Sequence, residues 1–391
     1  MLDSTRQTPS PITADNYEIS QPMSPLAPRP SPLPSDALLD VRNLRMYFPV
    51  LEGIFSKVKG YVKAADDVTF SVGAGETVGL VGESGCGKTT VGRCLLRAYQ
   101  PTGGEMRYRT RDGHVVDLAQ LDNRGLRPYR RDVRMIFQDP YSSLNPRMTV
   151  YELVSEVLTV NRICSGKEAE DRVATTLRCV GLRPEYMRRY PHAFSGGERQ
   201  RIVIARALVT EPRLVVADEA VSALDVSVRA QILNLMQSLR DEFNLTYLFI
   251  SHDLSVVRHI CDRVVVMYVG RVVEIAGGDA LYRRPLHPYT EALMSAVPIT
   301  NPRDRQRKAR IRLEGDVADP ANPPSGCYFH PRCRYAQDRC RTETPALRAV
   351  GADRMVACHF AETLELAGAP ISSSAACCVL RGHTKHVPRN T

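Results

Sequence analysis

The fold of this 391-residue chain is decided by the stretch Gly82-Glu83-Ser84-Gly85-Cys86-Gly87-Lys88-Thr89. It has the form G-x-x-x-x-G-K-[S/T], in which glycines let backbone N–H groups close around phosphate oxygens. The apolar run 77–81 precedes it as a buried strand, and residues 90–96 can continue it as a helix, a context that a chance glycine turn would lack. We therefore expect a nucleoside triphosphate site, where Lys88 neutralises β- and γ-phosphate charge and the Thr89 hydroxyl ligates Mg²⁺.

Two further apolar runs, residues 214–218 and 247–251, have the same character as the strand before the phosphate loop. Continuous apolar strands separated by helical stretches predict an α/β protein with a largely parallel sheet covered on both faces. The first run ends in Asp218-Glu219. Alone, this pair would be a solvated strand end. Behind a phosphate loop, Asp218 is expected to hold Mg²⁺ through water and Glu219 to polarise the attacking water.

Composition excludes some classes of protein and leaves others open. No run of about 18 apolar residues is present, so a membrane-spanning helix is not expected. The N-terminus has neither a basic start nor an apolar core, so a signal peptide is not expected either. Eleven cysteines without an export signal argue against a disulfide framework. The formal net charge of +9 predicts an acidic partner: a nucleic acid, an anionic membrane surface or a phosphorylated ligand.

A second anion site is predicted at Phe194-Ser195-Gly196-Gly197-Glu198-Arg199-Gln200-Arg201. Ser195, Gly196 and Gly197 precede an apolar-periodic helix over residues 202–208, and a helix N-terminus favours anions. The stretch resembles the signature motif of ATP-binding cassette (ABC) ATPases, usually written with glutamine where Glu198 stands. The resemblance implies a P-loop ATPase with a RecA-like core, an antiparallel β subdomain and an α-helical subdomain. It also implies a second ATPase subunit, because the signature of one subunit caps the ATP held by the other.

Three further motifs resemble ABC family positions and appear in the family order. Phe137-Gln138-Asp139-Pro140 resembles the Q-loop, where Gln138 contacts Mg²⁺ or lytic water and senses the membrane partner. Ser222-Ala223-Leu224-Asp225 resembles the D-loop, which places Asp225 at the dimer interface, and Ser251-His252-Asp253 resembles the switch, which brings His252 to the γ-phosphate. Alone, Gln138 would be ordinary surface and His252 a satisfied strand-end histidine. Ala220 departs from the proline that many members carry.

The resemblance thus implies three catalytic residues, Glu219, His252 and Gln138, and three metal-site residues, Thr89, Gln138 and Asp218. The expected signature residues are Ser195, Gly196, Gly197 and Glu198. The expected ATP-binding residues are Gly82, Glu83, Ser84, Gly85, Cys86, Gly87, Lys88, Thr89, Thr90 and Tyr61. Tyr61 is the favoured adenine-stacking aromatic because it lies just before the strand that leads to the loop, and Tyr47 and Phe48 are alternatives.

Three stretches resemble one branch of the family, the ATPases of oligopeptide and dipeptide importers, and most closely their second ATPase subunit. They are residues 138–146, 221–227 and 284–290. This resemblance implies a transport ATPase that couples ATP hydrolysis to uptake of di- or oligopeptides. It implies two membrane-spanning permease subunits, a second ATPase subunit that is a paralogue, and, indirectly, an external solute-binding protein. The expected location is peripheral, on the cytoplasmic face of the inner membrane.

Other functions stay open at this point. Nickel importers and importers of other small peptide-like solutes belong to the same branch. A soluble cassette acting on nucleic acid or ribosomes would use the positive charge directly, but such proteins usually carry two cassettes, so no nucleic acid is expected. A non-catalytic regulatory cassette is disfavoured because Glu219 and His252 are both present.

The resemblance also divides the chain. Residues 1–36 hold eight of the 27 prolines and six serines, which predicts a disordered leader. The ABC ATPase domain is expected over residues 37–283, with its helical subdomain at about 139–194. The peptide-importer extension is expected over residues 284–360 and a loose tail over 361–391.

Four cysteines fall in the extension: Cys327, Cys333, Cys340 and Cys358, separated by five, six and seventeen residues. Thiolates bind zinc and iron–sulfur clusters, but this spacing is not a zinc-ribbon pattern. It resembles the cysteine pattern of the importer extension, which can carry a [4Fe-4S] cluster. The nearby arginines at positions 332, 334, 339 and 341 are expected to neutralise such a cluster. Reduced free thiols or a non-native oxidised state are the alternatives.

Overall fold

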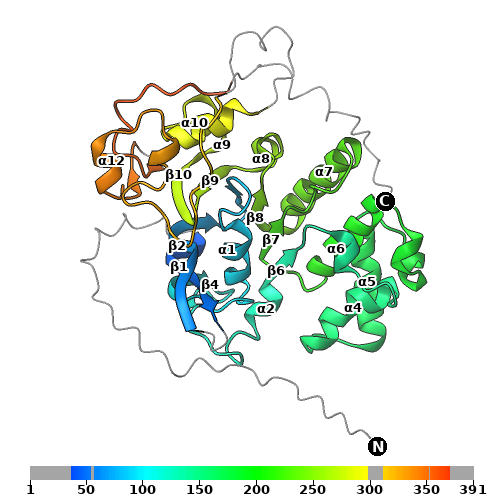
Figure 1. The fold of residues 1–391 in the computed structure, drawn as a ribbon. Helices are drawn as coiled ribbons and strands as arrows, with labels where there is room; N and C mark the ends of the chain where they lie inside the picture. Colours follow the sequence, from blue (N-terminus) through cyan, green and yellow to red (C-terminus); the bar gives the residue numbers. More distant parts are fainter. Residues whose placement is uncertain (1–36, 54–56, 298–310, 352, 370–391) are drawn as a thin grey trace, which may run out of the picture. The chain divides into compact units, whose positions relative to one another are not determined.

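The computed structural model describes residues 37–53, 57–297, 311–351 and 353–369. The predicted leader and the part of the predicted tail beyond residue 369 lie outside these residues. The described strands form an eight-stranded sheet in the order β11-β12-β10-β9-β3-β8-β7-β6 and a four-stranded sheet in the order β2-β1-β4-β5. Helices gather on both sides of the larger sheet (Figure 1).

Parallel strands form the centre of the larger sheet. β3 pairs in parallel with β8 and β9, β7 with β8, and β6 with β7. These strands are β3 (Thr77–Val81), β6 (Val133–Ile136), β7 (Leu214–Asp218), β8 (Thr246–Ser251) and β9 (Arg263–Tyr268). Every residue of β3, β7 and β8 is buried, which confirms the parallel sheet covered on both faces. Because parallel strands end at one edge, the segments that follow β3, β7 and β8 meet there.

The far edge of this sheet is antiparallel and includes the C-terminal extension. β10 (Arg271–Gly277) pairs with β9 and with β12 (Met355–Val356), which pairs with β11 (Arg348–Ala349). The extension therefore adds strands to the larger sheet and is not a detached module.

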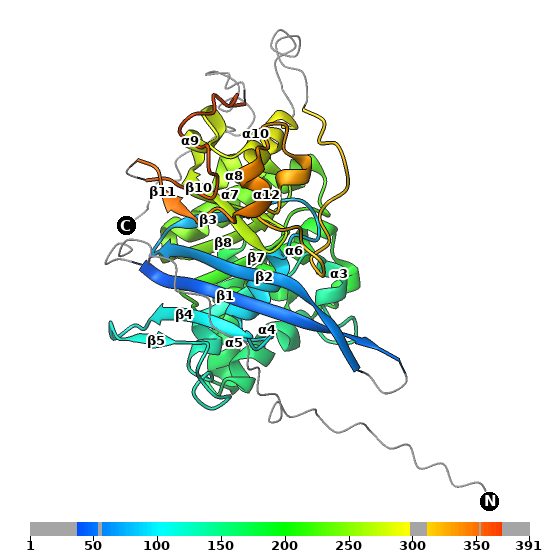
Figure 2. The ribbon, with the colours of Figure 1, turned by 60° about the vertical axis from the view of Figure 1, so that its left-hand side comes forward.

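The smaller sheet is antiparallel and corresponds to the predicted β subdomain. Figure 2 shows β1 (Ala37–Glu52) and β2 (Lys57–Gly73) as a long pair, with β4 (Gly103–Arg109) and β5 (Val115–Asp117) beside them. Its apolar face shares a core with β3 and with α1 (Lys88–Leu95). This core contains Leu39, Val68, Leu80, Val91 and Met106, all buried.

A helical region lies between β6 and β7. It consists of α3 (Pro140–Ser143), α4 (Val150–Val160), α5 (Gly166–Cys179), the 3₁₀ turns η1 (Pro184–Arg188) and η2 (Pro191–Ala193), and α6 (Gly196–Leu208). Val154, Val173 and Ile202 join α4, α5 and α6 in one core. The helix predicted over 202–208 begins earlier, at Gly196, because Ser195 caps its N-terminus.

The remaining helices cover the larger sheet or belong to the extension. They are α2 (Tyr129–Asp132), α7 (Val226–Phe243), α8 (Leu254–Ile260), α9 (Gly278–Arg283), α10 (Pro288–Ser295), η3 (His330–Arg332) and α12 (Asp338–Thr342). Within the described residues, no helix is long and apolar enough to cross a membrane.

The packed part of the C-terminal region extends to residue 369, beyond the end at residue 360 that the sequence predicts. Residues 361–369 were expected in a loose tail, yet Ala361, Leu366 and Ala369 are buried. The Ala369 N–H donates to the carbonyl of Tyr282 at 2.7 Å. Small and apolar side chains thus hold this segment against α9, a contact that a composition argument does not detect.

Candidate phosphate-binding and hydrolytic site

The phosphate loop joins β3 to α1, and its two outer glycines meet neighbouring backbone closely. Gly82 has φ +153°, and a Cβ there would lie 2.2 Å from the carbonyl oxygen of Met267. Gly87 has φ +99°, and a Cβ there would lie 1.9 Å from the carbonyl oxygen of Ala64. Only glycine fits at both positions, so the loop is held against β2 and β9 by close backbone contact.

Lys88, the first residue of α1, is almost completely buried at 5% exposure. Its ammonium group donates to the carbonyl oxygens of Gly82 and Glu83, at 2.8 Å each, and lies 3.6 Å from Sγ of Cys86. The charge is thus fixed over the loop by the loop's own backbone. A buried ammonium with only neutral partners favours an anion beside it.

Thr89 and Asp218 bring two oxygen groups together from α1 and β7. The Thr89 hydroxyl donates to Oδ1 of Asp218 at 3.1 Å. Burial raises the pKa of Asp218, and the hydrogen bond from Thr89 opposes that effect. Hydroxyl and carboxylate oxygens suit Mg²⁺, which is usually bound by one or two protein groups together with substrate phosphates. Within the described ranges, no group of three or more His, Cys, Asp or Glu side chains is placed to hold a metal ion.

Glu219 follows β7 and is contacted by two side chains from neighbouring loops. Its backbone has φ +49°, and its N–H donates to the carbonyl of Ile250 in β8 at 2.9 Å. The side-chain amide of Gln138 donates to its Oε2 at 2.9 Å, and Nδ1 of His252 lies 3.0 Å from its Oε1. The structure therefore brings Gln138, Glu219 and His252 together at the edge where the central strands end.

The predicted signature residues form the N-terminal cap of α6. The Ser195 side chain accepts from the Glu198 N–H at 3.4 Å, and Glu198 accepts from the Ser195 N–H at 2.9 Å, so the two form a capping box. Glutamine also completes a capping box, so Glu198 preserves the geometry of the usual motif. Among the described residues, Ser195 makes no hydrogen bond to the phosphate loop. Asp225 precedes α7, is exposed and caps it without a side-chain hydrogen bond.

Tyr61, the predicted adenine-stacking residue, lies in β2 opposite Pro49 of β1 and is 40% exposed. Its ring is available to a ligand, whereas Tyr47, one alternative, donates its hydroxyl to Asp66 at 2.6 Å. Phe48, the other alternative, packs edge-on against Tyr99 with ring centroids 5.4 Å apart.

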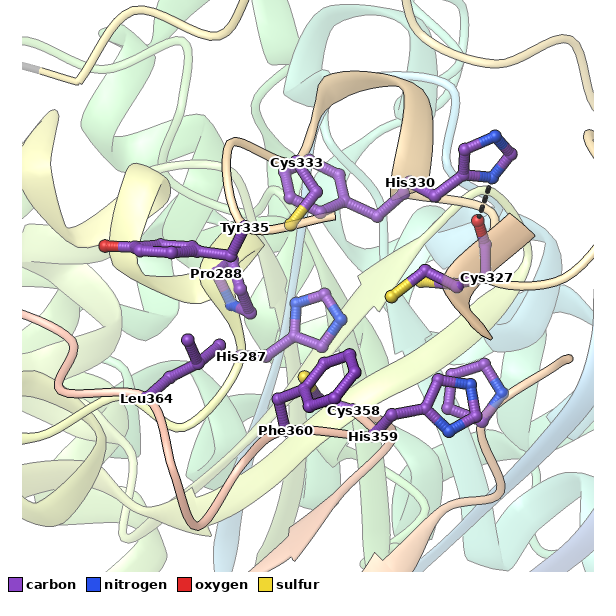
Figure 3. A pocket seen from close by; sticks show the side chains of 13 residues that line it. His287, Pro288, Cys327, His330, Cys333, Tyr335, Cys358, His359, Phe360 and Leu364 are labelled. Atoms are coloured by element: carbon purple, nitrogen blue, oxygen red, sulfur yellow. Dashed lines mark hydrogen bonds between the residues drawn. The ribbon is translucent and has the colours of Figure 1, made fainter. Parts of the chain in front are cut away.

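The four cysteines of the extension line a single pocket (Figure 3). All four are free thiols. Burial raises the pKa of Cys327 to about 11 and that of Cys333 to about 12. The pocket also contains His287 and Phe360.

The arginines near these cysteines do not have the partners that the sequence predicts. The guanidinium groups of Arg332, Arg334 and Arg339 pair with Glu83, Glu291 and Glu343, respectively, at 2.7–3.0 Å. Three of the four arginines are therefore directed to carboxylates and not to the thiols, contrary to the prediction.

One contact to the phosphate loop is missed by motif reasoning. Arg332 forks onto the Glu83 carboxylate at 2.7 and 3.2 Å, and the hydroxyl of Tyr289 accepts from the Glu83 N–H at 2.8 Å. Both residues belong to the C-terminal extension, more than 200 positions from Glu83 along the chain. No local sequence pattern predicts a contact between residues so far apart in the chain.

Fold and site together define an ATPase of the ABC class. Residues 65–222 match the family described as ABC transporter, and residues 273–340 match the C-terminal region of oligopeptide/dipeptide transporters. The structure resembles cbiO1 of Clostridium perfringens (TM-score 0.53, 26% identity, 63% of this chain and 91% of that one). It also resembles MJ0796, a bacterial ABC transporter cassette solved as a dimer (TM-score 0.53, 27% identity, 61% and 98%).

The chain belongs to the family of ATP-binding subunits of oligopeptide and dipeptide ABC transporters. It is 49% identical over 326 residues to the oligopeptide transport ATP-binding protein AppF of Bacillus subtilis, covering 83% of this chain and 98% of the relative. It is 48% identical over 327 residues to the di/tripeptide transport ATP-binding protein DppF of Pseudomonas aeruginosa, covering 84% and 98%. As an ABC ATPase it uses ATP and Mg²⁺.

Proposed function

We propose that this chain hydrolyses Mg-ATP to energise uptake of di- or oligopeptides. The observation that carries the proposal is the convergence of Gln138 and His252 on Glu219, beside Thr89 and Asp218. The substrate class is supported by relatives named for oligopeptide and di/tripeptide transport.

Each side chain has a role that its position supports. Lys88 and the loop N–H groups hold the β- and γ-phosphates. Thr89, Asp218 and Gln138 supply oxygen ligands for Mg²⁺, which when bound neutralises phosphate charge. Glu219 orients and polarises the attacking water, and His252 holds the Glu219 carboxylate while facing the γ-phosphate. Tyr61 stacks on adenine.

A second ATPase subunit completes the site. Ser195 caps α6 and bonds to Glu198, and Asp225 begins α7 without a side-chain hydrogen bond, so both are free to act on ATP held by the partner. A Cβ at Gly197 would lie 2.7 Å from a methyl group of Val228, so the signature turn fits closely against α7. The next residue after Asp225, Val226, is 79% exposed, an apolar side chain available to a protein partner. The partner is proposed to be a paralogue.

ABC importer ATPase subunits pair with membrane permease components. For this chain we propose two permease subunits, a peripheral position on the cytoplasmic face of the inner membrane, and indirect dependence on an external solute-binding protein. Two exposed aromatic side chains beside Gln138 support a protein contact there: Phe137 is 47% exposed and Tyr141 62%. A permease contact that moves this loop would also move Gln138, which is hydrogen-bonded to the Glu219 carboxylate.

The cysteine pocket is proposed to hold a [4Fe-4S] cluster. Four thiols in one pocket are a donor set that such clusters use. A four-iron cluster is larger than one ion and holds its thiolates farther apart, so the lack of a single-ion site in the described chain is compatible with it. Loading would displace thiol protons. Anaerobically purified protein should contain iron and absorb visible light, and Cys333→Ser should lose both. A folded, colourless and iron-free wild-type protein would contradict this part.

The proposed transport function is tested with the complete transporter in vesicles, supplied with ATP and its binding protein. We expect uptake of a labelled dipeptide or oligopeptide that requires ATP and this chain. ATP-dependent uptake of nickel without uptake of peptides would show that the transported solute is nickel and not a peptide. ATP turnover stimulated by nucleic acid and independent of the permease would contradict the transport function itself.

A further inference from the structure

We propose that Arg332 and Tyr289 of the C-terminal extension are positioning residues for the phosphate loop, and that through Glu83 they set its affinity for ATP. The inference rests on the proposed function, because it assigns a role within the same ATP site. It concerns residues that the motifs leave without a task.

Glu83 is contacted at every polar group that it carries. Its N–H donates to the Tyr289 hydroxyl at 2.8 Å, and its carboxylate pairs with both terminal nitrogens of Arg332. Its carbonyl accepts from the Lys88 ammonium at 2.8 Å. One of the two backbone carbonyls that hold the phosphate-binding lysine therefore belongs to the residue that the extension holds, and the other belongs to Gly82. A shift of Glu83 would disturb one of the two hydrogen bonds that fix the Lys88 ammonium.

Charge gives a second reason for the contact. Glu83 places a carboxylate within the loop that receives a triphosphate, and like charges repel most strongly where water is scarce. Arg332 neutralises this carboxylate with a bidentate pair, the strongest arrangement for such ions. The Arg332 side chain is only 8% exposed, and that of Glu83 27%. Without Arg332, the bound nucleotide would face an unpaired negative charge.

The two residues are mounted on a rigid aromatic cluster. The ring of Tyr289 packs against Tyr268 at 4.8 Å and against Phe329 at 5.4 Å between centroids. The Arg332 guanidinium lies 5.9 Å from the centroid of the Tyr268 ring. Packing of this kind fixes rotamers, so the hydroxyl and the guanidinium are preorganised toward the loop.

Simple attachment of the extension does not account for the contact. The extension is also held to β2 by the Tyr328 hydroxyl, which donates to Asp66 at 2.8 Å, and to β10 by Arg354, which donates to Glu274 at 2.6 Å. Its strand β12 pairs with β10. Replacing Arg332 or Tyr289, which contact Glu83, leaves these other contacts in place. The replacement should therefore change the affinity for the nucleotide and not the attachment of the extension.

The test measures kcat and KM for Mg-ATP, with the equilibrium affinity for Mg-ATP, on the full chain. Arg332→Met should raise KM and Kd about tenfold and leave kcat within about twofold, because the loss falls on nucleotide binding. Arg332→Lys should recover part of the affinity by restoring one charge. Glu83→Gln combined with Arg332→Met should bind better than Arg332→Met alone, since the unpaired carboxylate is gone. The matched control is Arg339→Met, which removes an exposed arginine of the same extension.

Tyr289→Phe keeps the ring and removes only the acceptor, so it decides the matter if Arg332→Met does not fold. It should raise KM several-fold with kcat retained. Unchanged KM in folded Arg332→Met and Tyr289→Phe would overturn the inference while leaving the proposed function intact. A wild-type chain that neither binds nor hydrolyses Mg-ATP would instead contradict the proposed function.

Discussion

Nδ1 of His252 lies 3.0 Å from Oε1 of Glu219, and the two residues follow adjacent parallel strands, β8 and β7. The contact joins the residue proposed to polarise water to the residue proposed to face the γ-phosphate. Because Gln138 holds the other carboxylate oxygen at 2.9 Å, Glu219 is oriented from both sides. The predictions below follow from this arrangement and from the phosphate loop beside it.

His252→Ala removes one of the two groups that orient the carboxylate. We expect kcat for ATP hydrolysis to fall about 100-fold, with KM for ATP changed little, because nucleotide binding depends on the loop. Steady-state hydrolysis measured beside His114→Ala, an exposed histidine next to β5, checks this. Equal activity in the two variants would remove His252 from the mechanism.

Lys88→Met keeps most of the length of the side chain and removes its charge. The affinity for Mg-ATP should fall about tenfold or more, which corresponds to about 1.4 kcal/mol or more of binding free energy. Titration calorimetry measures it directly. Lys59→Met is the matched control, because Lys59 is exposed and pairs with Glu52 at the surface. The account fails here if the two variants bind ATP equally well.

Much of the fold was predictable because its key elements are local. The run over residues 77–81, the glycine loop and Lys88 lie in one continuous stretch, so strand, turn and helix follow from neighbouring residues. The meeting of Asp218 with Thr89 also follows, since parallel strands end at one edge of a sheet. The proposed catalytic roles were expected from motif order, and the structure adds the hydrogen bonds that join Gln138 and His252 to Glu219.

Other contacts could not be predicted because they depend on long-range packing. Arg332 lies between two cysteines in the sequence, and its pairing with Glu83 exists only after the extension folds against the domain. The buried segment ending at Ala369 has a composition that resembles a loose tail until α9 is placed beside it. Periodicity and spacing describe local structure and do not specify which distant surfaces meet.

Asp218→Asn tests the cost of a buried carboxylate at the proposed metal site. The pKa of Asp218 is raised by burial, so its contribution to stability is fully present below its unfolded pKa and is lost as the pH rises through its folded pKa. At pH 7 without Mg²⁺, Asp218→Asn should therefore unfold about 2 °C higher than wild type. The difference should shrink toward pH 4.

Asp218→Asn should raise the unfolding temperature without Mg²⁺ but weaken the stabilisation that Mg-ATP provides. Mg-ATP should stabilise wild type against heat more than it stabilises Asp218→Asn, because the amide is a weaker Mg²⁺ ligand. Thermal unfolding between pH 4 and pH 8, with and without Mg-ATP, measures both effects. A lower unfolding temperature for Asp218→Asn at pH 7 without Mg²⁺ would refute this reading of the site.

Glu198 departs from the usual signature glutamine, and the capping box predicts that the difference is neutral for stability. Glu198→Gln should change the free energy of unfolding by less than about 0.5 kcal/mol, whereas Glu198→Ala should lower it by about 1 kcal/mol. Denaturant unfolding at pH 7 compares the three proteins, and a destabilised Glu198→Gln would show that the charge itself is required.

The central claim is that Glu219 of this chain drives ATP hydrolysis, and Glu219→Gln tests it most directly. The amide keeps the size of the side chain and can still contact Gln138 and His252, but it cannot polarise water as a carboxylate does. ATP turnover by the complete transporter should fall about 100-fold or more, while Mg-ATP binding is retained. Turnover equal to wild type in a correctly assembled Glu219→Gln transporter would contradict the account.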